Sequence, residues 1–165
     1  AQGEVVATVE KQGLTAPEAT FFARGRAGTR TVAPMLGRRC STMLCREVED
    51  HDEICSELRR QRPDLILWPG LMAPADGKEL QDPPEHVQQA GRLARSLGAW
   101  IVQSNWPEQL NYPERSWLCG RSVVLDPSGR IALALPSNEA GLAVFALGEN
   151  TFDWHPTRLV DQRAA

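Results

Sequence analysis

Two short strand patterns, each preceded by the pattern of an amphipathic helix, constrain the fold of this chain more than any other feature. Residues 64–68 read "DLILW", a short apolar strand, and residues 99–106 read "AWIVQSNW", which predicts another buried strand. Apolar strands of this length are typical of a sheet that is covered on both faces. Their alternation with helices predicts a layered α/β fold built on a mixed sheet.

The two helices are predicted from their end signals. The first begins after Asp50, a candidate N-cap with Glu53 three residues later, and ends before Pro63. The second begins after Asp82 and ends at Gly98. Its apolar stripe at helical spacing consists of Val87, Ala90, Leu93, Ala94 and Leu97.

Further strands are predicted toward both ends of the chain. "GEVVATVEK" indicates a strand from Glu4 to Glu10, and "RCSTMLC" indicates a strand that ends near Cys45. Two hairpin strands flank the turn Asp126–Gly129, and "GLAVFAL" predicts a last strand. We therefore predict one domain over residues 1–149, followed by an irregular tail over residues 150–165.

Charge and composition exclude several classes of protein. The net charge is −3, and the 18 basic residues are spread along the chain, which does not indicate binding to nucleic acid. No apolar run approaches the roughly 20 residues of a membrane span, and the N-terminus lacks the pattern of a signal peptide. Four cysteines without such a signal predict free thiols and a cytoplasmic location.

Cys45 is the candidate nucleophile because it ends an apolar strand just before a helix. In layered α/β folds, ligands gather outside the carboxyl ends of strands, where free backbone N–H groups can donate to an oxyanion. The acidic residues that follow disfavour a thiolate, so a cation is needed, and Lys11 is the candidate. Two alternatives stay open: Cys45 is a small core residue, or it forms a zinc site with Cys40, His51 and Cys55.

Five segments together resemble the nitrilase superfamily of carbon–nitrogen hydrolases in order and spacing. They are "GEVVATVEKQGLTAPEATFFARG", "STMLCREVED", "PDLILWPG", "AWIVQSNW" and "CGRSVVLDPSGRIALAL", and they run from about Gly3 to Glu149. The resemblance implies an α-β-β-α sandwich with a Glu-Lys-Cys triad, here without its N-terminal part. The base glutamate of the family lies upstream of its lysine, so this chain alone is expected to be inactive or weakly active.

The resemblance also implies roles for individual residues. Cys45 matches the nucleophile, and Lys11 and the backbone N–H of Arg46 match the groups that stabilise the oxyanion. Glu18 matches a supporting glutamate that orients the lysine or the substrate; the alternative is a solvated loop acid. The predicted substrate-binding residues are Glu47, Trp68, Pro69, Gly70 and Asn105, although Trp68 also fits the core.

The implied reaction hydrolyses a non-peptide carbon–nitrogen bond of a small molecule, an amide in preference to a nitrile or carbamoyl group. It proceeds through a cysteine thioester, from which water releases the acid. The resemblance implies no cofactor and no metal. The resemblance implies a homodimer, and the loop of residues 71–84 is expected to border the substrate entrance. The alternative is a catalytically impaired, truncated relative that acts as a binding or assembly domain.

Overall fold

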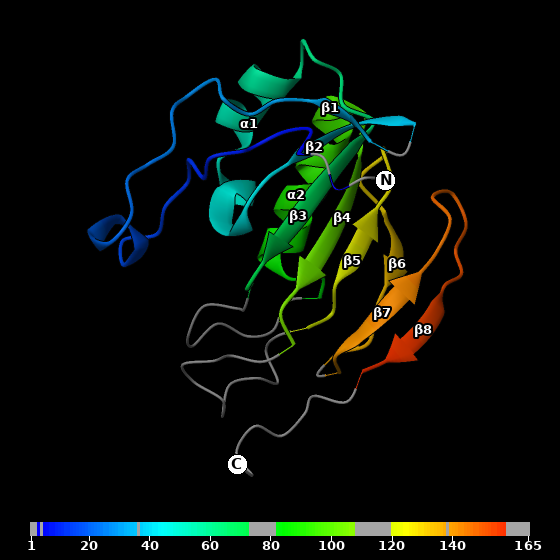
Figure 1. Ribbon diagram of the computed structural model, residues 1–165. Coiled ribbons are helices and arrows are strands. Elements are labelled where there is room, and N and C mark those ends of the chain that lie inside the picture. Colours follow the sequence, from blue (N-terminus) through cyan, green and yellow to red (C-terminus); the bar gives the residue numbers. More distant parts are fainter. Residues whose placement is uncertain are drawn as a thin grey trace.

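The centre of the molecule is a six-stranded sheet with the strand order β1-β2-β3-β4-β5-β6 (Figure 1). The computed structural model describes residues 3, 5–35, 37–72, 82–107, 120–137 and 139–157. The strands are β1 Ala33–Met35, β2 Arg38–Thr42, β3 Leu65–Gly70, β4 Trp100–Asn105, β5 Val123–Leu125 and β6 Ile131–Ala134. Strands β2, β3 and β4 are parallel and the outer pairs are antiparallel, which confirms the predicted mixed sheet.

Both predicted helices are present, and Figure 1 shows them together on one face of the sheet. They are α1 His51–Leu58 and α2 Glu85–Leu97. Gly98 ends α2 with a φ of 64°, the left-handed conformation for which glycine is favoured at this position. The helices and strands bury one apolar core that includes Ile54, Leu58, Ile66, Val87, Leu93, Ile101 and Leu125.

A second sheet is formed by β7 Gly141–Val144 and β8 Asp153–Pro156, which pair antiparallel. The prediction of an irregular tail is therefore wrong for residues 153–156. A Cβ at Gly141 would lie 2.3 Å from the Trp154 ring, so the glycine leaves room for the indole across the strand pair. Contact with β7, which lies some ten residues earlier, gives this polar segment its extended form.

The prediction of a strand over Glu4–Glu10 is wrong, because the described residues of this segment, 5–10, form no strand. Figure 1 shows the blue N-terminal segment running away from the sheet toward the short 3-10 helix η1 Glu18–Thr20. A strand needs a neighbour whose backbone groups pair with its own, and Val5 is 79% exposed. The segment is instead held locally, for example by the Gly25 N–H, which donates to the Lys11 carbonyl oxygen at 2.8 Å.

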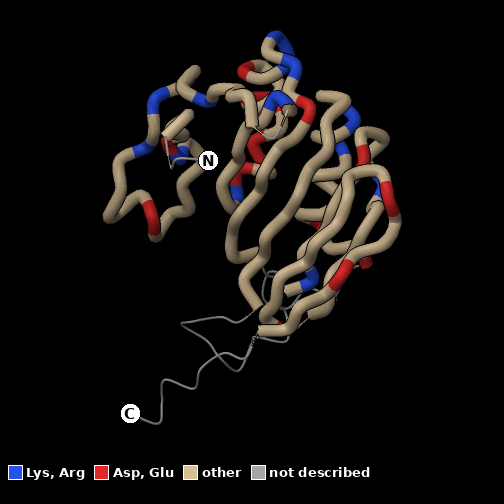
Figure 2. Tube along the Cα trace, turned by 45° about the vertical axis from the view of Figure 1, so that its right-hand side comes forward, with Lys and Arg blue, Asp and Glu red and all other residues tan. Residues whose placement is uncertain are grey.

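Charges of both signs are interspersed over the described part of the chain (Figure 2). Several form exposed pairs, such as Arg24 with Glu53 and Arg39 with Asp64. The hydrogen bonds from the Arg39 side chain and backbone N–H lower the pKa of Asp64 to about 2. Of the described helices, neither α1 nor α2 is long and apolar enough to cross a membrane.

Candidate active site

Cys45 lies beyond the carboxyl end of β2, next to the carboxyl end of the parallel strand β3. It begins the short 3-10 helix η2 Cys45–Glu49 with a left-handed φ of 53°. That conformation costs a non-glycine residue about 1–2 kcal/mol, and strained residues are frequent at functional sites. The Cys45 Sγ atom lies 3.7 Å from the Leu71 carbonyl oxygen and 3.9 Å from Met72 Sδ.

Strand β3 fixes the backbone of Cys45. The Trp68 indole N–H donates a 2.8 Å hydrogen bond to the Cys45 carbonyl oxygen, and a Cβ at Gly70 would lie only 2.8 Å from the Cys45 Cα atom. Both were predicted to contact substrate, with the core as the alternative for Trp68. The structure has Trp68 in the core, fully buried, and Gly70 provides the space that the Cys45 backbone occupies. Pro69, between them, is exposed on the wall of a large cavity.

Lys11 and Glu18 form an ion pair in the N-terminal segment. One carboxylate oxygen of Glu18 accepts from the Lys11 ammonium, and the other accepts from the Thr15 backbone N–H at 2.8 Å. Burial alone would raise the pKa of Glu18, but these hydrogen bonds outweigh it and hold the pKa below its usual range. Glu18 is therefore an ionised carboxylate that pairs with the Lys11 ammonium.

Glu47 is fully buried, although the sequence predicts that it contacts substrate. Its Oε1 atom accepts from the backbone N–H groups of Gln12 at 2.6 Å and Gly13 at 3.2 Å. Its Oε2 atom accepts from the Leu44 N–H at 2.6 Å and from Arg30 Nη1 at 3.0 Å. Burial alone would raise the pKa of Glu47, but the hydrogen bonds outweigh it and keep the group ionised with a lowered pKa.

Two cavities adjoin these residues. Lys11 and Glu18 line one of about 470 Å³. The other cavity, of about 760 Å³, is lined by Leu44, which precedes Cys45 in the chain, and by Gly70, which packs against the Cys45 backbone. The two cavities have no described lining residue in common. The structure thus joins the chain segments that carry the predicted nucleophile and the predicted ammonium, but it places the two beside different cavities.

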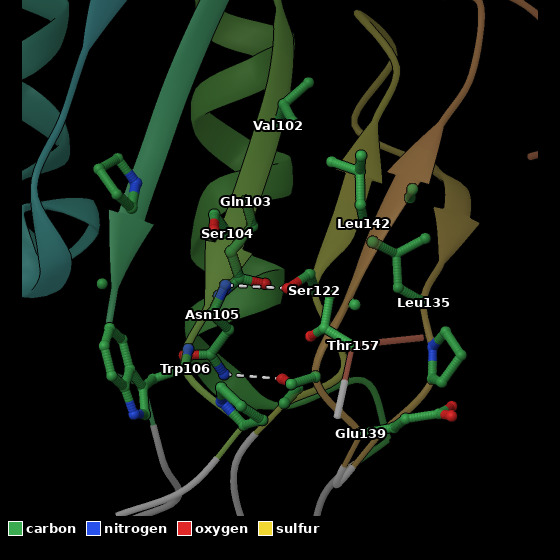
Figure 3. A pocket seen from close by; sticks show the side chains of 18 of the residues that line it. Val102, Gln103, Ser104, Asn105, Trp106, Ser122, Leu135, Glu139, Leu142 and Thr157 are labelled. Carbon is green, nitrogen blue, oxygen red and sulfur yellow. Dashed lines mark hydrogen bonds between the residues drawn. The ribbon is translucent and has the colours of Figure 1, made fainter. Parts of the chain in front are cut away.

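The larger cavity lies between β4 and the β7–β8 hairpin, as Figure 3 shows. Asn105, predicted to bind substrate, links the chain segments that line this cavity. Its backbone N–H donates to Ser122 Oγ at 2.9 Å. The Asn105 amide accepts from the Met72 and Trp106 N–H groups and donates to the Met72 and Gly120 carbonyl oxygens. These four hydrogen bonds use both donors and both acceptor lone pairs of the Asn105 amide. The side chain therefore holds the backbone of Met72, Trp106 and Gly120 in place, and no donor or acceptor of the amide is left for a substrate.

Two residues of this region carry no signal in the sequence. Arg30 follows a glycine-rich polar stretch that predicts solvent exposure, yet its side chain is only 1% exposed. Met72 begins the loop expected at the substrate entrance, and Asn105 holds its backbone so that its thioether lies beside the Cys45 sulfur. Residues 73–81 of that loop lie outside the described residues.

The alternative zinc site is not formed. Among the described residues, which include all four candidate ligands, no group of three or more His, Cys, Asp or Glu could hold a metal ion. Cys55 belongs to the apolar core, where burial raises the pKa of its thiol. Cys40 is also buried, and its thiol pKa is raised for the same reason. The fourth cysteine, Cys119, lies outside the described residues.

His86, which the sequence places on a helix surface without a role, packs edge-on against Trp68 with ring centroids 6.0 Å apart. Burial lowers its pKa from 6.5 to about 4, against a smaller opposing effect of Glu85. The folded state therefore keeps His86 neutral at pH values where the unfolded chain binds a proton. Stability is lost as the pH falls from about 6.5 toward 4.

A His86→Phe variant is expected to remove this acid sensitivity while keeping a ring against Trp68. Between about pH 7.5 and pH 5, the free energy of unfolding of the unmodified protein should fall by about 2 kcal/mol more than that of the variant. Urea unfolding followed by tryptophan fluorescence at both pH values measures the difference. Equal pH dependence of the two proteins would show that His86 titrates normally.

No protein-family model and no curated protein matches the sequence. Solved structures match the fold. A glutamine-dependent NAD+ synthetase from Acinetobacter baumannii has a TM-score of 0.65 and 22% identity, over 83% of this chain and 25% of that chain. Nit3 of Saccharomyces cerevisiae, a member of branch 10 of the nitrilase superfamily, has a TM-score of 0.63 and 15% identity, over 81% of this chain and 45% of that chain. This chain therefore has the fold of the nitrilase superfamily, which confirms the resemblance seen in its sequence.

A third solved structure with this fold is the NitN amidase from Nesterenkonia sp. AN1. It has a TM-score of 0.63 and 26% identity, over 81% of this chain and 48% of that chain. A mutant of that amidase carries the acetamide moiety of fluoroacetamide, covalently added at its active-site cysteine. The chain spans half or less of the length of each of these three relatives.

Proposed function

We propose that the protein is a carbon–nitrogen hydrolase that cleaves small amides through a thioester on Cys45. The observation that carries the proposal is the position of Cys45, a partly exposed cysteine with a strained backbone beyond the carboxyl end of a parallel strand. The fold is shared with an amidase whose active-site cysteine is known to be modified covalently. The amide class is taken from that relative.

The proposed reaction transfers the acyl group in two steps, first from the amide nitrogen to the Cys45 sulfur and then from the sulfur to water. In the first, the Cys45 sulfur attacks the amide carbon while a base takes the thiol proton, and a tetrahedral oxyanion forms. Its collapse breaks the carbon–nitrogen bond, the nitrogen takes up the proton, and ammonia or an amine leaves. In the second, water attacks the thioester carbon, the acid is released, and the sulfur regains a proton.

Lys11 and the backbone N–H of Arg46 are the proposed donors to the oxyanion. Arg46 directly follows Cys45 in η2, so its N–H lies in the same turn as the sulfur. The Lys11 ammonium is oriented by the ionised Glu18. One such donor commonly lowers a barrier of this type by about 3 kcal/mol.

The general base is proposed to be a glutamate from the part of the family fold that these residues do not span. Two acidic side chains that follow Cys45 in the chain are already engaged, since Glu47 holds backbone N–H groups and Asp50 pairs with Arg46. Residues 1–165 alone are accordingly proposed to be weakly active or inactive. A protein that also supplies the base should be faster by roughly 10²–10⁴-fold.

Ammonia release from aliphatic amides, with nitriles and N-carbamoyl compounds in parallel, tests the function directly. A protein that contains these residues and also supplies the base should release ammonia from amides, and its Cys45→Ala variant should not; the other activity measurements use the same protein. A folded protein that releases nothing while still binding amides would instead support the alternative of a binding domain.

Gly70→Ala is expected to disturb the nucleophile without touching its chemistry. The new Cβ would have to share space with the Cys45 backbone, so Cys45 must move, and a displacement near 1 Å can reduce turnover by roughly 10²-fold. Amide hydrolysis by the fully folded variant measures the effect. Gly37→Ala is the control for a loss of stability alone, because its positive φ strains an alanine while its Cβ would meet no atom within 4 Å. Equal losses in the two variants would contradict this role of Gly70.

A further inference from the structure

The buried carboxylate of Glu47 bonds to both chain segments that the proposed reaction requires. Its Oε1 atom holds the N–H groups of Gln12 and Gly13, which directly follow Lys11. Its Oε2 atom holds the N–H of Leu44, which directly precedes Cys45. One rigid group thus bridges two segments that lie more than thirty positions apart in the sequence.

Arg30 fixes the orientation of that carboxylate. Its Nη1 atom donates to Glu47 Oε2 at 3.0 Å and to the Thr42 carbonyl oxygen, at the end of β2, at 3.0 Å. Its Nε atom donates to Glu57 of α1 at 3.2 Å. The side chains of Arg30 and Glu47 are 1% and 0% exposed, so water does not compete for these bonds.

The hydrogen bond from the Gly13 N–H to Glu47 requires a residue without a side chain at position 13. A Cβ at Gly13 would lie 2.9 Å from Glu47 Cγ and 2.3 Å from an oxygen of Asp50. The Gly13 backbone therefore reaches the carboxylate only because it has no side chain. A substituent there would push the segment that carries Lys11 away from Glu47, while Glu47 and Arg30 keep their own functional groups.

We propose that Glu47, oriented by Arg30, is a positioning residue that sets the separation between the Lys11 ammonium and the Cys45 sulfur. The role rests on the proposed function, since it matters for catalysis only if Cys45 and Lys11 act on one substrate. Glu47 itself touches no substrate, because its side chain is fully enclosed. The chain has only two lysines, Lys11 and Lys78, which makes the separation measurable by chemical cross-linking.

The experiment uses a short reagent with a thiol-reactive and an amine-reactive end, and peptide mass spectrometry to count Lys11–Cys45 links. The unmodified protein should give this link. Glu47→Gln replaces one acceptor oxygen by an NH2 group that faces N–H donors, so one of the two segments is released. Its link yield should fall about tenfold, and so should kcat, while KM changes little, since misplacement affects turnover more than binding.

Gly13→Ala is the second variant and should lose the link with Glu47 and Arg30 intact. Glu53→Gln is the matched control, because it breaks the exposed Arg24–Glu53 pair and should leave both the link and kcat unchanged. All samples are compared well below their unfolding temperatures, so a loss of stability alone does not change the yield.

The outcomes separate this proposal from the proposed function. An unchanged Lys11–Cys45 link in folded Glu47→Gln and Gly13→Ala overturns the positioning role, whether or not amides are hydrolysed. Absence of the link in the unmodified protein overturns it as well. A link that is present, and is lost in both variants, supports the role even if the protein hydrolyses no amide, in which case only the proposed function fails.

Discussion

Replacing Cys45 with alanine, in a protein that also supplies the base, is expected to reduce amide hydrolysis by roughly 10⁴-fold or more. The sulfur is the atom that becomes acylated, and no thioester forms without it, so removing an enzyme nucleophile has one of the largest effects known for a single substitution. The fold should persist, because Cys45 lies at the margin of the apolar core and is partly exposed. Steady-state ammonia release and circular dichroism of the same sample measure activity and folding.

Cys40→Ala is the matched control for this substitution. Cys40 lies on β2 ahead of Cys45, and it is 5% exposed, so its thiol is out of reach of substrate. The control should cost some stability and leave kcat of the folded protein unchanged. Full activity in Cys45→Ala, or a loss in Cys40→Ala as large as in Cys45→Ala, would refute the assignment of the nucleophile.

Lys11→Met is expected to lower kcat/KM by roughly 10²–10³-fold. Methionine keeps the length and apolar body of the side chain and removes only the ammonium, so the loss reports the charge that stabilises the oxyanion. Glu18 would also lose the partner that now holds it in place. Initial rates with an amide substrate below KM give kcat/KM directly.

Arg26→Met is the control for Lys11→Met. It removes a cation from the same N-terminal segment, but the Arg26 side chain is 81% exposed and pairs only with Glu10 among the described residues. Its kcat/KM should be unchanged. If Lys11→Met retained full activity, Lys11 would be no more than a partner of Glu18, and the oxyanion would have to be stabilised by other groups.

The pattern of the sequence predicts those elements whose neighbours lie close along the chain. Helices α1 and α2 have end signals and apolar stripes within their own residues, and the hairpin β5–β6 has its turn, closed by the Gly129 N–H donating to the Asp126 carbonyl oxygen at 2.8 Å. The segment Glu4–Glu10 has the composition of a strand but no pairing partner in the described structure. Strand β8 has little strand pattern but gains one from β7.

The candidate site follows the same division. Cys45 is predicted from its place between a strand and a helix, and the Lys11–Glu18 contact joins two residues seven positions apart. The burial of Glu47 could not be predicted, because a charged residue close to a candidate nucleophile indicates a substrate contact, whereas for Trp68 the core was one of two predicted alternatives. Arg30 is buried only because Glu47, Glu57 and the end of β2 surround it, and none of these contacts leaves a local pattern.

The most direct test of the account is to quench the protein during turnover of a slowly hydrolysed amide and map the acylated residue by peptide mass spectrometry. The account predicts one acyl group, bound to the sulfur of Cys45, which disappears when the substrate is exhausted and is absent in Cys45→Ala. An acyl group on another residue that appears and decays at the rate of turnover would contradict it, as would undiminished ammonia release without any acylated protein.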